Sequence, residues 1–415
     1  MKPSTFASAL VAAVCVCALA KPALAARCDQ LMKLDANGQP TTTPVPPVVT
    51  IAGSSPLKTM YATFAPALFN DSALPVTIVY RVTPSCTAVN NVLAGQPMAT
   101  NDTTEAIYWD PNSKTAANGT TTAKEEKCTL ANGTLAAIGT SDVFAPTCGV
   151  ALQGLPTGFA DFQGPIQIPT FAVNRNSKEQ VISAEAAYML FGHAKLAPWT
   201  DPKFIFRRNA ASGTQLLIAA AIGVDAKRWA GVDSGSSDGV FTSLANLSTQ
   251  ADQDKSIGIL LSDFASKQEL RILAYQHYGQ RCGYKPDATA LDKKHVREGR
   301  YTIWGPLHMF TQVDGSGLAK DQRARDLIAY MIGTKAAPGG LELLRTQVQI
   351  GNVPECAMKV KRSSEMGPLS TFQHPQPCGC AFDKEATGTS TCKTCQNNSE
   401  CSSSQSCNFG FCENQ

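Results

Sequence analysis

Two strand-then-helix units near the start of the chain most constrain its fold. The apolar residues 48–52 predict a strand, and Ser55 and Pro56 just after it are residue types that begin helices. Residues 76–80 predict a second strand, after which Ser85 stands at the start of another helical stretch. Strands that alternate with helices form a mostly parallel sheet, which binds ligands where loops leave the carboxyl ends of its strands. The sequence therefore predicts an α/β protein with polar loops at that edge.

The beginning of the chain has the features of an export signal. Lys2 precedes an apolar stretch over about 7–20, and Ala23-Leu24-Ala25 comes just before Ala26. This pattern predicts a secretory signal peptide over residues 1–25, cleaved from the mature chain. No later apolar run approaches the roughly 18 residues that a bilayer requires, so we expect no transmembrane segment in the mature chain. The expected location is the periplasm or the extracellular space.

Cysteine usage is typical of an oxidising compartment. The chain has 15 cysteines, and two of them, Cys15 and Cys17, fall in the predicted signal, which leaves 15 − 2 = 13. An odd number implies one thiol that is free or paired between chains.

Residues 367–415 differ in composition from the rest of the chain. They include seven cysteines and few large apolar side chains, so cross-links or metal must replace a core. Cys392 and Cys395 have the spacing of a zinc-binding pair, but export favours disulfides. The spacing of the last four cysteines resembles that of EGF-like modules. This cysteine-rich tail is either a docking module for an envelope or matrix partner or an inert, protease-resistant end.

Several function classes lack support in the sequence. Charged residues are well mixed at a formal net charge of +3, so no broad basic face is expected and no nucleic-acid partner. The segment 235–239 has nucleophile-elbow spacing but follows polar residues instead of a strand, and we interpret it as a loop. The five histidines form no zinc-protease motif, and no Walker loop occurs. We expect no catalytic residue, no metal and no cofactor, and hence not an enzyme.

One predicted helix start in the middle of the chain is suited to anions. Arg208 supplies charge, and Ser212, Gly213 and Thr214 precede the apolar run 215–224. The first amides of a helix have no intrahelical partner and lie at the positive end of its dipole, so they can bind an oxyanion. The same residues also fit an ordinary helix cap with a solvated arginine nearby.

The order and spacing of these loops resemble the phosphate-binding protein of bacterial ABC phosphate transporters, a type II periplasmic binding protein. The likeness runs along most of residues 48–335. The residues that carry it are Gly53-Ser54-Ser55, Ser85, Ser141-Asp142, Phe191-Gly192, Trp199-Thr200-Asp201-Pro202, Arg208, Ser212-Gly213-Thr214, Ser256-Ile257-Gly258-Ile259 and Gly299-Arg300-Tyr301-Thr302. The resemblance implies two lobes with a hinge, and it implies ligand contacts at Ser55, Ser85, Asp142, Arg208, Ser212, Gly213 and Thr214.

The chain also departs from that family's pattern. Ser54-Ser55-Pro56 replaces the family's Gly-Ala-Gly-Ala-Thr-Phe run, and Cys86-Thr87-Ala88 replaces a Ser-Gly-Gly stretch. An insertion over about 87–139 is rich in Asn, Thr, Ala and Gly, which predicts a surface loop. The resemblance implies that the chain captures a ligand. Because the transporter component has neither the insertion nor the tail, the candidate partners are a membrane permease and an envelope protein.

An aspartate beside an anion has a chemical use. The ionised carboxylate of Asp142 can only accept hydrogen bonds, so it binds an oxyanion that still carries a proton and repels fully ionised sulfate. This favours phosphate or arsenate. The alternatives are that Asp142 caps a turn after a strand, or pairs with Arg208 in an empty cleft.

The sequence thus predicts a two-lobed α/β fold of the type II periplasmic-binding-protein kind with a disulfide-rich tail. The expected function is capture of a small oxyanion, phosphate above all, by lobe closure. A ligand-free scaffold that acts as an extracellular interaction or adhesion protein is the alternative, and a secreted phosphatase is a third hypothesis without an evident nucleophile. The expected parts are a signal (1–25), lobe 1 (26–170, with the inserted loop), lobe 2 (171–285), a return to lobe 1 (286–366) and the tail (367–415).

Overall fold

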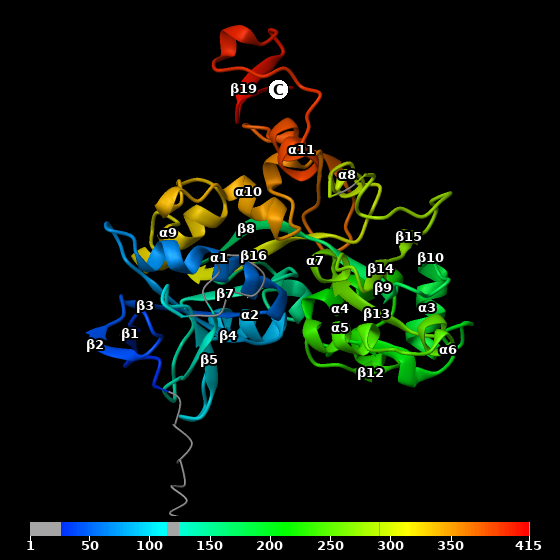
Figure 1. Ribbon diagram of the computed structural model, residues 1–415, viewed down its shortest axis with the longest axis horizontal. Helices are drawn as coiled ribbons and strands as arrows, with labels where there is room; N and C mark the ends of the chain where they lie inside the picture. The colour runs from blue at the N-terminus through cyan, green and yellow to red at the C-terminus, as the bar shows by residue number, and fades with distance from the viewer. Residues whose placement is uncertain (1–25, 114–123, 290, 415) are drawn as a thin grey trace, which may run out of the picture.

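The chain forms two α/β lobes and a small tail. The computed structural model describes residues 26–113, 124–289 and 291–414, and the predicted signal peptide lies outside these ranges (Figure 1). Each lobe is built around its own sheet, and the tail packs on the outside of the first lobe. The predicted two-lobed α/β fold with a disulfide-rich tail is confirmed. No helix among the described residues has the length and apolar character needed to cross a bilayer.

A seven-stranded sheet is the centre of lobe 1. In spatial order its strands are β6 (Glu126–Thr129), β5 (Glu105–Tyr108), β4 (Thr77–Val82), β3 (Val48–Gly53), β7 (Ile138–Ser141), β16 (Gly305–Gln312) and β8 (Phe159–Gln167). The three central strands, β4, β3 and β7, run parallel, and the outer strands are antiparallel to their neighbours. The carboxyl ends of β4, β3 and β7 therefore meet at one edge.

Helices on the sheet of lobe 1 begin where the serines predict. The short 3-10 turn Ser55–Leu57 leads into α1 (Lys58–Phe69), and α2 (Ser85–Leu93) begins at Ser85. In α1, Met60, Phe64 and Leu68 are buried against the sheet because they recur every four residues and share one face. The remaining helices of this lobe are α9 (Gln322–Met331) and α10 (Leu343–Gln349), and a hairpin of β1 (Met32–Leu34) and β2 (Pro40–Pro44) lies at its edge.

The segment expected as an inserted surface loop is partly sheet. Within 87–139, β5 and β6 extend the sheet beyond β4, and Trp109 and Cys128 are fully buried. Cys128 is joined by a disulfide to Cys28, which ties these strands to the start of the described chain. Each strand has only four residues, too few to show a recognisable alternation of apolar and polar side chains.

Lobe 2 has a five-stranded sheet. In spatial order its strands are β12 (Val232–Asp233), β11 (Ile205–Arg207), β13 (Ile257–Leu261), β9 (Pro169–Asn174) and β14 (Leu270–Ile272). The other elements of this lobe are β10 (Val181–Ser183), which pairs with β15 (Ala274–Gln276), and the helices α3 (Ala184–His193), α4 (Gly213–Ile222), α5 (Ser237–Ala245), α6 (Gln250–Asp254) and α7 (Ser262–Ala265). Phe191 packs on Phe171 and Trp229 in the core, with ring centroids 5.8 and 4.2 Å away.

The chain passes between the lobes twice. It leaves the first sheet at the end of β8 and enters the second at β9, with Ile168 between them. It returns through the short helix α8 (Lys294–Arg297) to β16. The hydroxyl of Tyr301, on the return segment, donates to the carbonyl oxygen of Pro169 at 2.6 Å. The two crossing segments therefore lie side by side and are bonded to each other.

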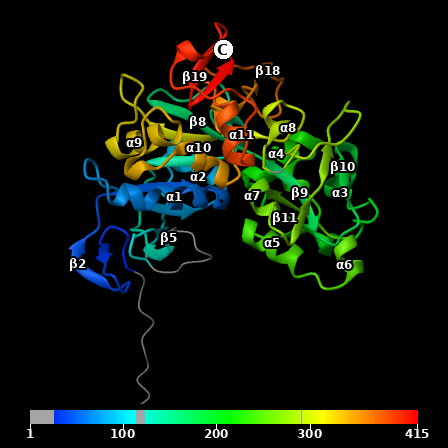
Figure 2. The same ribbon diagram turned by 45° about the horizontal axis from the view of Figure 1, so that its top comes forward.

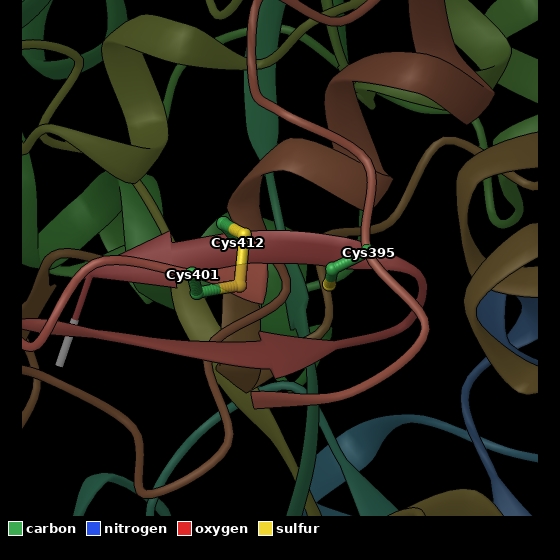
Figure 3. Close-up of side chains that lie close together, drawn as sticks. All are labelled: Cys395, Cys401 and Cys412. Carbon is green, nitrogen blue, oxygen red and sulfur yellow. A yellow bond between two sulfur atoms is a disulfide. The ribbon is translucent and has the colours of Figure 1, made fainter. Parts of the chain in front are cut away.

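Six disulfides join all but one of the cysteines in the part of the chain described. Four of them hold the tail and its attachment: Cys356–Cys378, Cys380–Cys392, Cys395–Cys407 and Cys401–Cys412. The tail consists of α11 (Gly379–Thr387) and a hairpin of β19 (Gln405–Asn408) and β20 (Phe411–Asn414). Sulfur atoms of three of its cysteines gather at this hairpin (Figure 3). All three belong to disulfides, so they offer no thiolate to a metal ion.

The cysteine left over is Cys282. Its thiol is free and exposed, on the loop that follows β15. The odd count expected from the sequence therefore corresponds to this position.

Candidate anion-binding site

Loops from both lobes meet at the carboxyl ends of parallel strands (Figure 2). In lobe 1, Ser54 follows β3, Ser85 begins α2 beyond β4, and Asp142 directly follows β7. In lobe 2, Arg208 directly follows β11, and Gly213 begins α4. Hydrogen bonds join these loops to one another across the two lobes. The site therefore occupies the edge at which open α/β sheets bind their ligands.

Arg208 is the buried cation of this site, with only 4% of its surface exposed. One terminal nitrogen donates to the hydroxyl of Ser237 at 2.7 Å, and the other donates to the hydroxyl of Ser55 in the opposite lobe at 3.2 Å. Its Nε donates to the carbonyl oxygen of Gly235 at 3.4 Å. Burial lowers the pKa of the guanidinium, and the negative charge of Asp142 opposes that effect. An arginine stays protonated despite such a shift, so Arg208 places a positive charge in a site that is shielded from solvent.

Asp142 is the buried anion, and it is fully inaccessible. The hydroxyl of Ser54 donates to both carboxylate oxygens at 3.2 and 3.3 Å, and that of Ser85 donates to Oδ2 at 3.4 Å. Burial raises the pKa of Asp142 to about 6, against the attraction of Arg208 and these hydrogen bonds. Above that pH the carboxylate is ionised and can only accept.

The amino end of α4 faces these groups. The backbone amide of Gly213 donates to the hydroxyl of Ser85 at 3.2 Å. The hydroxyls of Ser212 and Thr214 are buried, and neither has a hydrogen-bond partner among the residues that the structure describes. Buried polar groups are normally paired, so these two call for a partner that can reach the start of the helix. A ten-residue helix also places the positive end of its dipole here.

Only glycine fits at position 213. A Cβ there would lie 2.6 Å from the Cβ and from Oδ2 of Asp142, and 2.6 Å from the hydroxyl of Ser85. The absence of a side chain allows the helix amide to approach the carboxylate and the hydroxyl this closely.

A disulfide connects two loops of lobe 1 at the site. Cys86 directly follows Ser85, and it is bonded to Cys148 in the 3-10 turn that follows Asp142. The amide of Cys86 also donates to the carbonyl oxygen of Ala211 in lobe 2 at 3.4 Å. The cross-link therefore fixes the distance between the Ser85 and Asp142 loops.

Buried titratable groups support the Asp142 loop from behind. Glu365 accepts from the amide of Phe144 at 2.9 Å and from the hydroxyl of Thr147 at 2.5 Å. His308, on β16, is fully buried with its Nδ1 2.7 Å from Asp161, and the ring of Phe144 lies 4.3 Å from its own. These contacts hold the loop from three different segments of lobe 1.

The structure brings the seven residues expected from the resemblance to one place. Direct hydrogen bonds link Ser55 with Arg208, and Ser85 with both Asp142 and Gly213. Ser212 and Thr214 flank Gly213 at the same helix start.

Three contributors at the site were not predicted. Ser54 bonds the carboxylate of Asp142, and Ser237 and the carbonyl of Gly235 bond the arginine. The segment 235–239, interpreted as a loop, in fact contains the start of α5. A signal for this was present, since Ser236 caps α5 by accepting from the amide of Gly239.

Chemically, the arrangement suits a small anion that carries a proton. A guanidinium, helix amides and several hydroxyls supply donors, and one ionised carboxylate supplies an acceptor for a proton of the ligand. Sulfate, which has no proton at neutral pH, would meet the negative charge of Asp142 without a compensating bond.

Several solved structures are similar in fold to this chain. A phosphate transport receptor of the ABC type from Vibrio cholerae shares 13% identity and a TM-score of 0.46, over 74% of this chain and 99% of the other. A phosphate-binding protein from Stenotrophomonas maltophilia shares 12% and 0.42, over 83% and 99%. A high-affinity periplasmic phosphate-binding protein bound with phosphate shares 14% and 0.44, over 74% and 90%. No family model and no curated protein sequence matches. At these scores, what this chain binds has to be inferred from its own residues.

Proposed function

We propose that this protein is a solute-binding protein that captures a small protonated oxyanion, phosphate or arsenate, between its lobes. The observation that carries the proposal is a helix start that faces a buried arginine, where the buried hydroxyls of Ser212 and Thr214 have no partner in the described part of the chain. Orphaned donors, a dipole and a guanidinium together are what an oxyanion would satisfy.

The expected energies are consistent with several donors acting together. Charge-assisted hydrogen bonds contribute about 1.5–3 kcal/mol each, against an association cost of about 4–15 kcal/mol. Micromolar affinity requires about 8 kcal/mol net, so Arg208 alone is insufficient. The hydroxyls of Ser55 and Ser85 and the amides at the start of α4 would have to contribute.

The role proposed is binding outside the cytoplasm, without catalysis. Six disulfides support an oxidising compartment, either the periplasm or the extracellular space. Release of the bound anion to a membrane permease, or attachment to an envelope protein through the tail, is the partner interaction we propose with it.

One observation favours the alternative of a scaffold that has lost its ligand. The two lobes are bonded directly to each other, because the Gly213 amide donates to Ser85 and the Cys86 amide donates to Ala211. In that case the surface of the lobes and the tail would serve extracellular interaction or adhesion.

Isothermal titration calorimetry distinguishes the two functions. The protein is titrated with phosphate, arsenate and sulfate at pH 8, alongside Arg208→Ala and the matched control Arg207→Ala. Arg207 is the adjacent arginine, and its side chain bonds Asp233 and the backbone carbonyl oxygens of Gly231 and Arg208, but none of the described side chains of the proposed site. We expect Arg208→Ala to weaken phosphate binding by about 2–4 kcal/mol, roughly 30-fold to 1,000-fold, with little change in the control.

Two results would contradict the proposal. Saturable phosphate binding that is equally strong in Arg208→Ala would remove this arginine from the site. Absence of any heat and of any phosphate-induced rise in melting temperature would favour the ligand-free scaffold, since a bound ligand must stabilise the folded state.

A further inference from the structure

A second cavity lies between lobe 1 and the cysteine-rich tail, away from the anion site. It has a volume of about 610 Å³ and is bounded by the end of α9, by α10, by residues 354–356, by α11 and by the hairpin of β19 and β20. Within the tail, the hairpin lies beyond α11, which itself packs on α10 (Figure 1). None of the seven proposed anion-site residues lines it. A cavity of this size and mixed lining is typical of sites for small organic molecules.

Part of the wall of this tail cavity is apolar and aromatic. Met331 and Pro354 are buried, and Leu343, Leu344 and Phe411 are half-buried along it. They come from both lobe 1 and the tail, so a ligand here would contact both.

Phe409 stands at the rim in a conformation that its residue type disfavours. Its φ is 51°, and 55% of its surface is exposed. With Gly410, whose φ is 81°, it forms the two-residue turn between β19 and β20, where Asn-Gly is the favoured pair. A bulky residue with positive φ costs free energy, and such strain is concentrated at functional sites. An exposed aromatic ring that is retained despite this unfavourable backbone conformation indicates a functional role for the ring.

Charged side chains of both signs line the tail cavity, three cations and three carboxylates. Arg345 pairs with both Glu342 and Glu385, so that group keeps one net negative charge. Lys335 is neutralised by Asp326. Glu355 lines the cavity, and its carboxylate has no hydrogen bond or ion pair with any residue that the structure describes. Lys384 is the cation on the rim without a carboxylate partner, and its ammonium group donates to the carbonyl oxygen of Gly388.

We propose that the tail cavity binds an apolar organic cation, an ammonium group attached to an aromatic or branched hydrocarbon body. The faces of Phe409 and Phe411 attract a cation through their negative π-faces, and Glu355 supplies the opposite charge. The buried apolar wall receives the hydrocarbon body. This site is independent of the anion site, and its ligand is of the opposite charge.

The test compares two probes that share a body and differ in charge. We would titrate 4-phenylbutylamine and 4-phenylbutanoate into the full chain at pH 7.5 by calorimetry, with and without saturating phosphate. We expect saturable binding of the amine and at least tenfold weaker binding of the carboxylate, in the same way with and without phosphate. Equal binding of the two probes, or no saturable binding of the amine, would overturn the proposal.

Two substitutions locate the binding in the cavity. Glu355→Gln should weaken the amine at least fivefold, whereas Glu269→Gln, an exposed carboxylate in lobe 2, should leave it unchanged. Phe409→Asn puts a residue suited to positive φ into the turn, so the tail should stay folded or become more stable while amine binding weakens. Unchanged amine affinity in Glu355→Gln and Phe409→Asn would exclude this cavity as the site.

Discussion

Replacing Asp142 by asparagine should stabilise the ligand-free protein at neutral pH. The carboxylate is fully buried, and its pKa of about 6 lies above the ordinary value of 3.8, because burial disfavours the charged form more than Arg208 and two hydroxyls favour it. Asparagine is nearly the same size and has no charge to bury. Its oxygen can still accept from Ser54 or Ser85, whose hydroxyls can turn to accept from its amide.

The magnitude follows from the difference between the two pKa values of Asp142. A folded state that holds the proton more tightly is most stable when that proton is bound, so the contribution to the free energy of unfolding falls as pH rises from 3.8 through about 6. The difference of about 2.2 pKa units, at 1.36 kcal/mol each, gives a loss of about 3 kcal/mol. Because this pKa already includes the attraction of Arg208, it is a net value. We expect Asp142→Asn to be more stable than wild type by up to about 3 kcal/mol at pH 8 and by nearly nothing at pH 4.

Urea unfolding measures this difference. Tryptophan fluorescence is followed at intervals from pH 4 to pH 8 in buffers free of phosphate, because a bound anion would stabilise the wild type and hide the effect. The expected result is a wild-type stability that falls between pH 4 and pH 6 more steeply than that of Asp142→Asn.

Asp263 offers a matched comparison. Burial raises its pKa to about 6 as well, but it lies in the first turn of α7 in lobe 2, and none of its described contacts is with a proposed anion-site residue. Asp263→Asn should therefore gain similar stability and keep its phosphate affinity, whereas Asp142→Asn should lose discrimination against sulfate. The reasoning is refuted if Asp142→Asn is no more stable than wild type at pH 8.

Three further predictions concern the same site. Gly213→Ala should cost about 1–3 kcal/mol of stability and weaken phosphate binding at least tenfold, because its Cβ would lie 2.6 Å from atoms of Asp142 and Ser85; urea unfolding and calorimetry measure both. Removing the disulfide with Cys86→Ser and Cys148→Ser should weaken phosphate binding about tenfold in calorimetry, since the two loops are no longer held at a fixed distance. Sulfate should bind detectably at pH 5 and not at pH 8 as Asp142 gains its proton, and identical sulfate titrations at both pH values would contradict this.

The general fold could be predicted because local signals agreed with it. The apolar strand 48–52 and the serines at helix starts predict parallel strands and helices, and the structure has them as β3, α1 and α2. The strands β5 and β6 could not be predicted, since such short segments are held in place by pairing with β4 and by the Cys28–Cys128 disulfide. Edge pairing of this kind is set by tertiary contacts.

The sequence predicted the helix start of the site but not all of the residues that contact it. Arg208 and Gly213 could be found because an arginine followed by small polar residues and an apolar run has a direct physical meaning. Ser237 escaped notice because it lies 29 residues further along the chain, and only the pairing of β11 with β12 brings it to the guanidinium. Whether Ser54 or Ser55 faces the carboxylate depends on the direction in which the 3-10 turn leaves β3.

The hydrogen bond from the Gly213 amide to the Ser85 hydroxyl limits the affinity with which a ligand can bind at this helix start. A ligand that accepts a hydrogen bond from this amide must displace the Ser85 hydroxyl. Its measured affinity therefore reports the exchange of one acceptor for another, not the gain of a new hydrogen bond. A residue at position 85 that cannot accept from this amide would leave the amide without that acceptor. Such a substitution should lower the stability of the unbound protein and raise its affinity for the ligand.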